Sequence, residues 1–95
     1  MEAVRNTETG PGWAVSAKTA RPRLLALFAE VLQLPETEVD PAADFFALGG
    51  HSVSAGRIIG AVRRETGVRV SLIAFFEDPT LQGLEGLVVA GATRS

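Results

Sequence analysis

Hydrophobic positions in this chain recur every three or four residues over most of its length, which is the period of helices packed on a core. The first such run follows Pro22, a residue that suits the opening turn of a helix, and it continues to about Leu34, next to Pro35. Its apolar positions share one face of the predicted helix: Leu24, Leu27, Phe28, Val31 and Leu32. The run predicts a first helix from Pro22 to about Leu34.

A second helical run begins at Ser52, just after Gly49, Gly50 and His51, and ends near Thr66, where Gly67 occupies the usual stop position. We expect Ser52 to cap this helix. At about 100° per residue, its residues separate onto two faces. The predicted core face consists of Ala55, Ile58, Ile59 and Val62, and the predicted solvent face consists of Val53, Gly56, Arg57, Gly60 and Arg64.

The segment between the first two helices, residues 35–51, has turn residues around a short apolar stretch and predicts a long loop. Phe45 and Phe46 are expected to hold this loop against the core. Phe75 and Phe76, further along the chain, are expected to be core residues as well.

Two more helices are predicted after Gly67. Ser71 is expected to cap a short third helix, and the last helix is expected to begin near residues 78–80. The inward positions of the last helix are predicted to be Leu81, Leu84 and Val88. The one strand-like run, residues 68–70, is too short to build a sheet. The chain is therefore predicted to be all-α: a four-helix bundle with a long loop between helices one and two and a short third helix.

The chain has 95 residues, which is enough for one small domain and too short for a second core. Residues 1–20 show neither a helical nor a strand period, and they predict a flexible leader in which Trp13 has no assigned role. The domain itself is predicted to span residues 21–91, with a short tail at residues 92–95.

The composition excludes several classes of function. Apolar residues make up 46% of the chain and charged residues 21%, the balance of a folded domain. There is no Cys and a single His, so we expect neither a disulfide framework nor a metal site. The net charge of -2 and the lack of a long apolar run argue against nucleic acid and membranes as partners. We expect a cytoplasmic protein.

The most informative segment places the hydroxyl of Ser52 at a helix start, behind Gly49 and Gly50. Free amide donors and the helix dipole favour an anion at that point by about 0.3 to 1 kcal/mol. The capping-box position three residues on is Ala55, so the hydroxyl of Ser52 is not committed to a reciprocal cap. A phosphate ester would suit Ser52, while the plainer interpretation is an ordinary helix cap.

From about Pro22 to Val89 the chain resembles the peptidyl carrier (thiolation) domains of nonribosomal peptide synthetases, which have the acyl-carrier-like fold. Three segments carry the resemblance in order and spacing: residues 24–34, Asp44-Phe45-Phe46-Ala47-Leu48-Gly49-Gly50-His51-Ser52, and Phe76-Glu77-Asp78-Pro79-Thr80-Leu81.

The resemblance implies a non-catalytic carrier with 4′-phosphopantetheine attached covalently to Ser52. The arm would come from coenzyme A through a phosphopantetheinyl transferase, with Gly50 and His51 supporting the turn. The carrier would hold aminoacyl or peptidyl groups as thioesters in nonribosomal peptide biosynthesis. Its partners would be that transferase and adenylation, condensation, tailoring or thioesterase domains. We expect a monomer, whether free-standing or part of a larger synthetase.

Three residues near the attachment point are predicted to bind partners: Val53, Gly56 and Arg57. Ser54 is expected to be a solvated side chain. His51 has two interpretations of equal weight: contact with the phosphate or the transferase, and a loop residue that only suits the turn.

Three other functions are alternatives to the carrier. A minimal serine hydrolase built around Ser52 would need a preceding strand and a second glycine where the chain has Ser54. An acyl carrier of polyketide or fatty acid type would share the fold and the arm, but such carriers tend to have an acidic second helix, and this one has three arginines. The third alternative is a helical interaction module whose serine is not modified.

Overall fold

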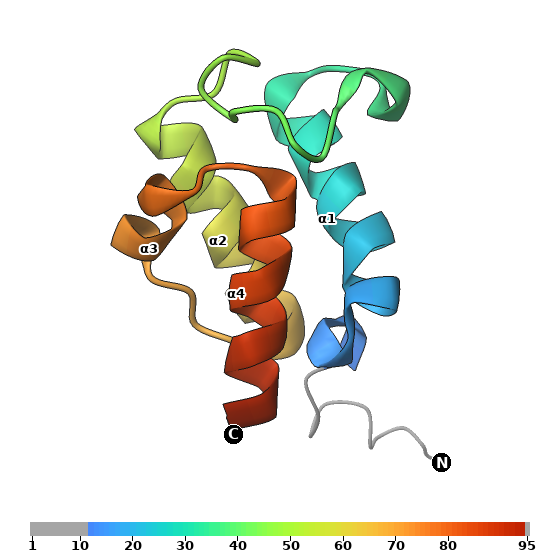
Figure 1. Cartoon of the computed structure of the whole chain (residues 1–95), viewed down its shortest axis with the longest axis vertical. Coiled ribbons are helices and arrows are strands. Elements are labelled where there is room, and N and C mark those ends of the chain that lie inside the picture. The colour runs from blue at the N-terminus through green and yellow to red at the C-terminus, as the bar shows by residue number, and fades with distance from the viewer. Residues whose placement is uncertain (1–11, 95) are drawn as a thin grey trace.

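The computed structural model describes residues 12–94, and every regular element within them is helical (Figure 1). In chain order the elements are the 3-10 helix η2 (Gly12–Val15), α1 (Ala17–Leu32), the 3-10 helix η3 (Glu36–Glu38), α2 (Ser52–Thr66), α3 (Leu72–Glu77) and α4 (Leu81–Arg94). This confirms the predicted bundle of four α-helices, with a long loop after the first and a short third helix. None of the described helices has both the length and the apolar character needed to cross a membrane.

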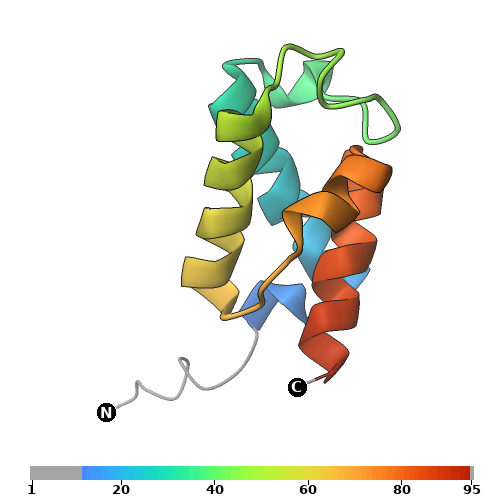
Figure 2. The ribbon, with the colours of Figure 1, turned by 90° about the vertical axis from the view of Figure 1, so that its left-hand side faces the viewer.

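The three longer helices, α1, α2 and α4, run lengthwise beside one another, and short α3 lies across the bundle between α2 and α4 (Figures 1 and 2). The long α1–α2 loop covers one end of the bundle, and the end of α4 lies at the opposite end, beside η2. The loop therefore delivers the chain to the start of α2 at the end of the molecule farthest from η2.

The centre of the core is a group of three phenylalanines from three parts of the chain. Phe28 of α1, Phe45 of the long loop and Phe75 of α3 are almost completely buried and meet edge to face, with ring centroids 5.4 to 6.5 Å apart. Fully buried aliphatic side chains from α1, α2 and α4 surround them: Leu24, Ile58, Val62, Leu81, Leu84 and Val88. The predicted inward residues of α4 are confirmed, and Phe45 holds the loop to the core as expected.

The neighbouring aromatic residues are not core. Phe46 and Phe76 were expected to be buried, but 37% of Phe46 and 38% of Phe76 is exposed, and their rings pack on each other at 5.6 Å. Successive residues of a turn or helix point in different directions, so only one member of each Phe-Phe pair can reach the core. The other member is left on the surface.

The prediction that no regular structure precedes Pro22 is wrong for residues 12–20. Ser16 caps α1 by accepting a hydrogen bond from the Thr19 N–H at 3.3 Å, so the helix begins at Ala17 and Pro22 lies inside it. Ala14 and Ala20 are fully buried, because their small side chains allow this segment to pack closely on the bundle. Residues 1–11 of the predicted leader lie outside the described residues.

Both ends of the helical region also differ in detail from the prediction. The first helix ends at Leu32, with Gln33 in the left-handed conformation that stops it (φ 59°). At the other end, α4 continues to Arg94, and Ala92 is buried, so residues 92–94 are helical rather than a tail. The limits 21–91 for the functional domain stay a prediction.

Trp13, which received no role from the sequence, ties η2 to the end of α2. Its indole N–H donates a hydrogen bond to Glu65 Oε1 at 3.1 Å. The same carboxylate accepts two hydrogen bonds from Arg23 of α1, at 2.8 and 2.6 Å. The bonds from Arg23 lower the pKa of Glu65, Trp13 and the charge of Arg64 lower it further, and partial burial opposes them. We call these three side chains, Trp13, Arg23 and Glu65, the clamp.

Candidate functional site

The turn before α2 is fixed by the aromatic core. Phe45 donates its backbone N–H to the carbonyl oxygen of Pro79 at 2.7 Å, which attaches the loop to the start of α4. Gly50 in turn donates to the carbonyl oxygen of Phe45 at 3.0 Å, and a Cβ at Gly50 would overlap the Phe45 ring. Gly49 has a φ of 103°, which favours glycine. Both glycines are therefore required by the path of the chain.

The second helix spans Ser52–Thr66 with Gly67 as its C-cap, as predicted, but its N-cap is His51. His51 Nδ1 accepts a hydrogen bond from the Ser54 N–H at 3.4 Å, and the Ser54 hydroxyl oxygen accepts one from the His51 N–H at 2.8 Å. Together these bonds form a capping box. The imidazole of His51 thus helps to begin the helix through Nδ1.

Two sequence predictions about this turn are therefore wrong. Ser52 was expected to cap α2, and it is instead the first residue of the helix. Ser54 was expected to be solvated, and it is buried within the capping box. The physical reason is the extended backbone of His51 (φ -149°, ψ 179°), which places the helix boundary one residue earlier. The sequence signal for this, a serine three residues after a polar residue, is weaker than the usual Glu or Gln.

As the first residue of α2, Ser52 presents a free hydroxyl. It is exposed, and its hydroxyl group forms no hydrogen bond with any residue of the described chain. The backbone N–H groups of Ser52 and Val53 likewise have no acceptor within residues 12–94, as expected in the first turn of a helix. A nucleophilic oxygen and two free amide donors thus meet at the positive end of a 15-residue helix. This group of atoms fits a phosphate ester on Ser52.

The residues predicted to bind partners are exposed on α2 beside this hydroxyl. Val53 is 64% exposed, and Arg57 and Gly56 also face solvent. Nothing lies within 4 Å of a Cβ built on Gly56, so the long loop does not approach the helix there. The helix buries Ala55, Ile58 and Val62 on its opposite face, and the predicted division of α2 is confirmed for these residues.

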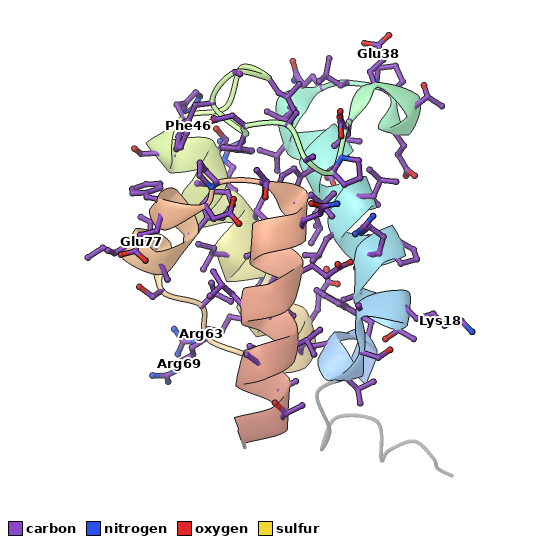
Figure 3. The ribbon with its side chains drawn as sticks, viewed as in Figure 1. Lys18, Glu38, Phe46, Arg63, Arg69 and Glu77 are labelled. Carbon is purple, nitrogen blue, oxygen red and sulfur yellow. The ribbon has the colours of Figure 1, made fainter. Side chains whose placement is uncertain are left out.

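Sequence reasoning missed an exposed apolar group on the neighbouring elements. Ile73 of α3 is 73% exposed and Leu72 is 36% exposed, and the Phe46–Phe76 pair joins the long loop to the same helix. Figure 3 shows Phe46 at the loop end of the bundle, on the side of α3. The sequence signal for this surface is the pair of consecutive apolar residues Leu72 and Ile73. Because a short helix buries only one face, two neighbouring apolar residues cannot both be buried.

The chain matches a known protein family over most of its length. The family is described as "Phosphopantetheine attachment site", and the match covers residues 22–88, which include the whole turn and α2. Membership implies a covalently attached 4′-phosphopantetheine group.

Relatives with closely similar sequences are much longer proteins. One, of Salinispora arenicola, bears the name "Probable non-canonical nonribosomal peptide synthetase (NRPS) CymA"; it is 49% identical over 57 residues, 60% of this chain and 1% of that protein. The dimodular nonribosomal peptide synthase of Bacillus subtilis is 35% identical over 97 aligned residues, covering 96% of this chain and 4% of that protein. The chain thus corresponds to only a small part of these relatives.

The fold has a solved counterpart. The HMG-ACPI domain of the CurA module from Lyngbya majuscula superposes with a TM-score of 0.74 over 99% of this chain and 91% of that domain, at 17% identity. At that identity the likeness concerns the fold alone, and it confirms the acyl-carrier-like bundle. Because residues 22–88, most of the chain, match the family's model, this chain belongs to the phosphopantetheine attachment site family.

Proposed function

We propose that this chain is a carrier in nonribosomal peptide biosynthesis, with its 4′-phosphopantetheine arm attached to Ser52. When bound, the arm supplies a terminal thiol that holds aminoacyl or peptidyl groups as thioesters. The observation that carries the choice of residue is the exposed hydroxyl of Ser52, which has no hydrogen bond within the described residues, at the start of α2.

Two other serines, Ser54 within α2 and Ser71 before α3, are less suitable as the attachment residue. Ser54 is buried and its hydroxyl both donates to and accepts from the backbone of His51. Ser71 caps α3, accepting a hydrogen bond from the Ala74 N–H at 3.2 Å, and its helix has only six residues. Ser52 therefore combines access, a free hydroxyl and unpaired amide donors in a way that these serines do not.

The arrangement also supports a non-catalytic role. A serine nucleophile needs a base that is hydrogen-bonded to its hydroxyl and oriented by a third group. No such bond reaches the Ser52 hydroxyl within the described chain. The chain's single histidine, His51, instead accepts a hydrogen bond at Nδ1 from the Ser54 N–H. We infer that the chain supplies attachment and position, and that separate enzymes supply catalysis.

Those enzymes would be a phosphopantetheinyl transferase and then adenylation, condensation, tailoring or thioesterase domains. We propose that they contact the exposed face of α2 at Val53, Gly56 and Arg57, next to the point where the arm leaves. The exposed side chains of Phe46, Phe76 and Ile73 would extend this contact. An exposed apolar group on a small domain is a common mark of a protein interface. A monomer acting in the cytoplasm remains our prediction.

Intact mass spectrometry tests the attachment. The protein is incubated with coenzyme A, magnesium and a transferase of broad specificity, and its mass is measured before and after. We expect the parent to gain one phosphopantetheine, Ser52→Ala to gain none, and Ser71→Ala to gain one like the parent. Full loading of Ser52→Ala, or no loading of the parent where a known carrier loads fully, would refute the proposal.

A second measurement identifies the class of cargo. The loaded protein is offered amino acids with adenylation enzymes, and malonyl or acyl groups with acyltransferases. Aminoacylation supports the proposal, which the names of the relatives favour. Transfer of acyl groups alone would point to a polyketide or fatty acid carrier, the alternative that shares this fold. Reaction of unloaded Ser52 with a fluorophosphonate would indicate a hydrolase.

A further inference from the structure

A cleft of about 460 Å³ runs between α1 and α2 and is lined in part by Arg57, one of the residues proposed to contact partners. Figure 2 shows the two helices alongside each other, with α2 in front of α1. The cleft has an apolar floor and charged walls. Leu27 and Ala61 are buried in the floor and Val31 is partly buried.

The charges on the cleft walls are not balanced. Three arginines line it, Arg23, Arg57 and Arg64, together with two carboxylates, Glu30 and Glu65. The cleft therefore has a net positive charge, although the net charge of the whole chain is -2.

One of these carboxylates, Glu65, is already hydrogen-bonded within the clamp. Both oxygens of Glu65 accept hydrogen bonds from Arg23, and one of them also accepts the Trp13 N–H. A carboxylate so engaged repels an incoming anion less strongly than a free one. The clamp thus ties α2 to α1 across the cleft and leaves two cations, Arg57 and Arg64, against one carboxylate, Glu30, to determine what the cleft attracts.

The α2 side of the cleft carries two exposed cations, of which Arg64 also acts on Glu65 through its charge. Arg57 and Arg64 are exposed, and within residues 12–94 neither forms a hydrogen bond or ion pair with a carboxylate. They are seven residues apart on α2, so they project from the same face at a separation of about 10 Å. Ala61, midway between them, exposes almost nothing and leaves room above the floor.

We propose that this cleft docks an acidic segment of a partner protein. Two carboxylates about 10 Å apart would meet the guanidinium groups of Arg57 and Arg64, whose planar donors match a carboxylate. An apolar side chain between them would rest on Leu27, Val31 and Ala61. The proposal rests on the proposed carrier function only in that a carrier needs partner proteins. It goes beyond that function in extending the contact surface from Arg57 into the cleft and in naming the charge of the partner.

The position of the cleft suits simultaneous use with the arm. Arg57 lies five residues after Ser52, which is about 7 to 8 Å along the helix axis. A partner held in the cleft would lie beside the attachment point and leave the Ser52 hydroxyl open. The cleft can therefore recruit a partner while the arm reaches into the partner's site.

The test uses the full chain before any phosphopantetheine arm is attached. A helical peptide of about 15 residues, with two glutamates about 10 Å apart and leucine and alanine between them, is titrated into labelled protein. Amide shifts are followed by NMR. We expect saturable shifts at Leu27, Arg57, Ala61 and Arg64, and at least tenfold weaker binding by the double variant Arg57→Gln/Arg64→Gln.

Matched controls separate docking from general charge attraction. Arg63 and Arg69 are also exposed and unpaired within the described chain, lie outside the cleft, and point away from the bundle in Figure 3. The double variant Arg63→Gln/Arg69→Gln removes the same charge and should bind the peptide within about twofold of the parent. The same peptide with glutamines in place of its glutamates should bind at least tenfold more weakly than the acidic peptide.

Several outcomes would overturn the proposal: no saturable binding, equal weakening in the two double variants, equal binding of the glutamine peptide, or shifts outside the cleft. Thermal unfolding of each variant identifies any loss of fold. Because the titration needs no arm, failed docking leaves the loading result at Ser52 intact. A failure of Ser52 to load equally leaves the titration interpretable.

Discussion

Gly50 lies with its α-carbon against the ring of Phe45 and donates its N–H to the Phe45 carbonyl oxygen, so no side chain fits at residue 50. The ring is completely buried and makes edge-to-face contacts with Phe28 and Phe75. The turn that presents Ser52 is therefore seated on the aromatic centre of the core. Presentation of the hydroxyl and the stability of the fold depend on the same contact.

Replacing Gly50 with alanine should destabilise the protein by about 1 to 3 kcal/mol, because the methyl group would overpack the aromatic core. The turn should shift as well, which slows loading of Ser52 by the transferase. Urea unfolding and the initial rate of mass gain measure the two effects.

Gly56→Ala is the matched control for this substitution. Gly56 is another glycine close to Ser52, but it is exposed, and nothing lies within 4 Å of the added methyl group. It should stabilise the protein by about 1 kcal/mol through helix propensity alone. Equal stability of Gly50→Ala and the parent would show that the Phe45 ring yields easily and that the contact does not fix the turn.

The capping box predicts opposite behaviour for two neighbouring serines. Ser54→Ala removes the hydroxyl that bonds the backbone of His51, and should cost about 1 to 2 kcal/mol. Ser52→Ala removes a hydroxyl without a hydrogen bond in the described chain and should change stability by less than about 0.5 kcal/mol. Urea unfolding of both variants tests this contrast, and a larger cost at Ser52 would contradict it.

The elements that the sequence predicted well are those whose signals are local. Helix α2 was located to within one residue because Gly49 and Gly50 lie just before its N-cap, Gly67 follows it, and its apolar face shows the helical period. The region around Trp13 could not be predicted in this way. Its partner, Glu65, is 52 residues away, and a single tryptophan and two alanines produce no periodic pattern.

The candidate site was predicted only in part, because only some of its features have local signals in the sequence. The Gly-Gly-His-Ser segment indicated the hydroxyl of Ser52 correctly as accessible, because glycines and a helix start are local features. Which residue caps the helix depends on the backbone angles of His51, and hydrophobicity does not report them. Which phenylalanine of each pair is buried depends on the direction of the chain at that point.

The two phenylalanines of the loop should differ strongly in their effect on stability. Phe45→Ala empties the centre of the core and should cost about 3 to 5 kcal/mol, enough to unfold much of a small domain. Phe46→Ala removes a surface contact with Phe76 and should cost about 1 kcal/mol or less. Thermal unfolding distinguishes them. Similar large losses in both variants would show that Phe46 belongs to the core and is not available to partners.

The clamp gives the protein a specific dependence on pH. Because the pKa of Glu65 is lowered in the folded state, its contribution is fully present above the unfolded-state pKa, about 4.3. It is lost as the pH falls through the lower folded-state value. Glu65 is partly exposed, so solvent screening limits the contribution to about 1 kcal/mol or less. Glu65→Gln should thus be less stable than the parent at pH 7, and the difference should shrink below about pH 4.

Unfolding followed by fluorescence measures this effect at the clamp itself, because Trp13 is the chain's single tryptophan. Glu77→Gln is the control, since Glu77 is exposed, forms no ion pair within the described residues and points away from the bundle (Figure 3). It should match the parent within about 0.5 kcal/mol. A stability difference between Glu65→Gln and the parent that persists unchanged at pH 3 would mean that the carboxylate charge is not what Arg23 and Trp13 recognise. In that case, the amide of glutamine would be failing for reasons of shape, and the clamp would not respond to acid.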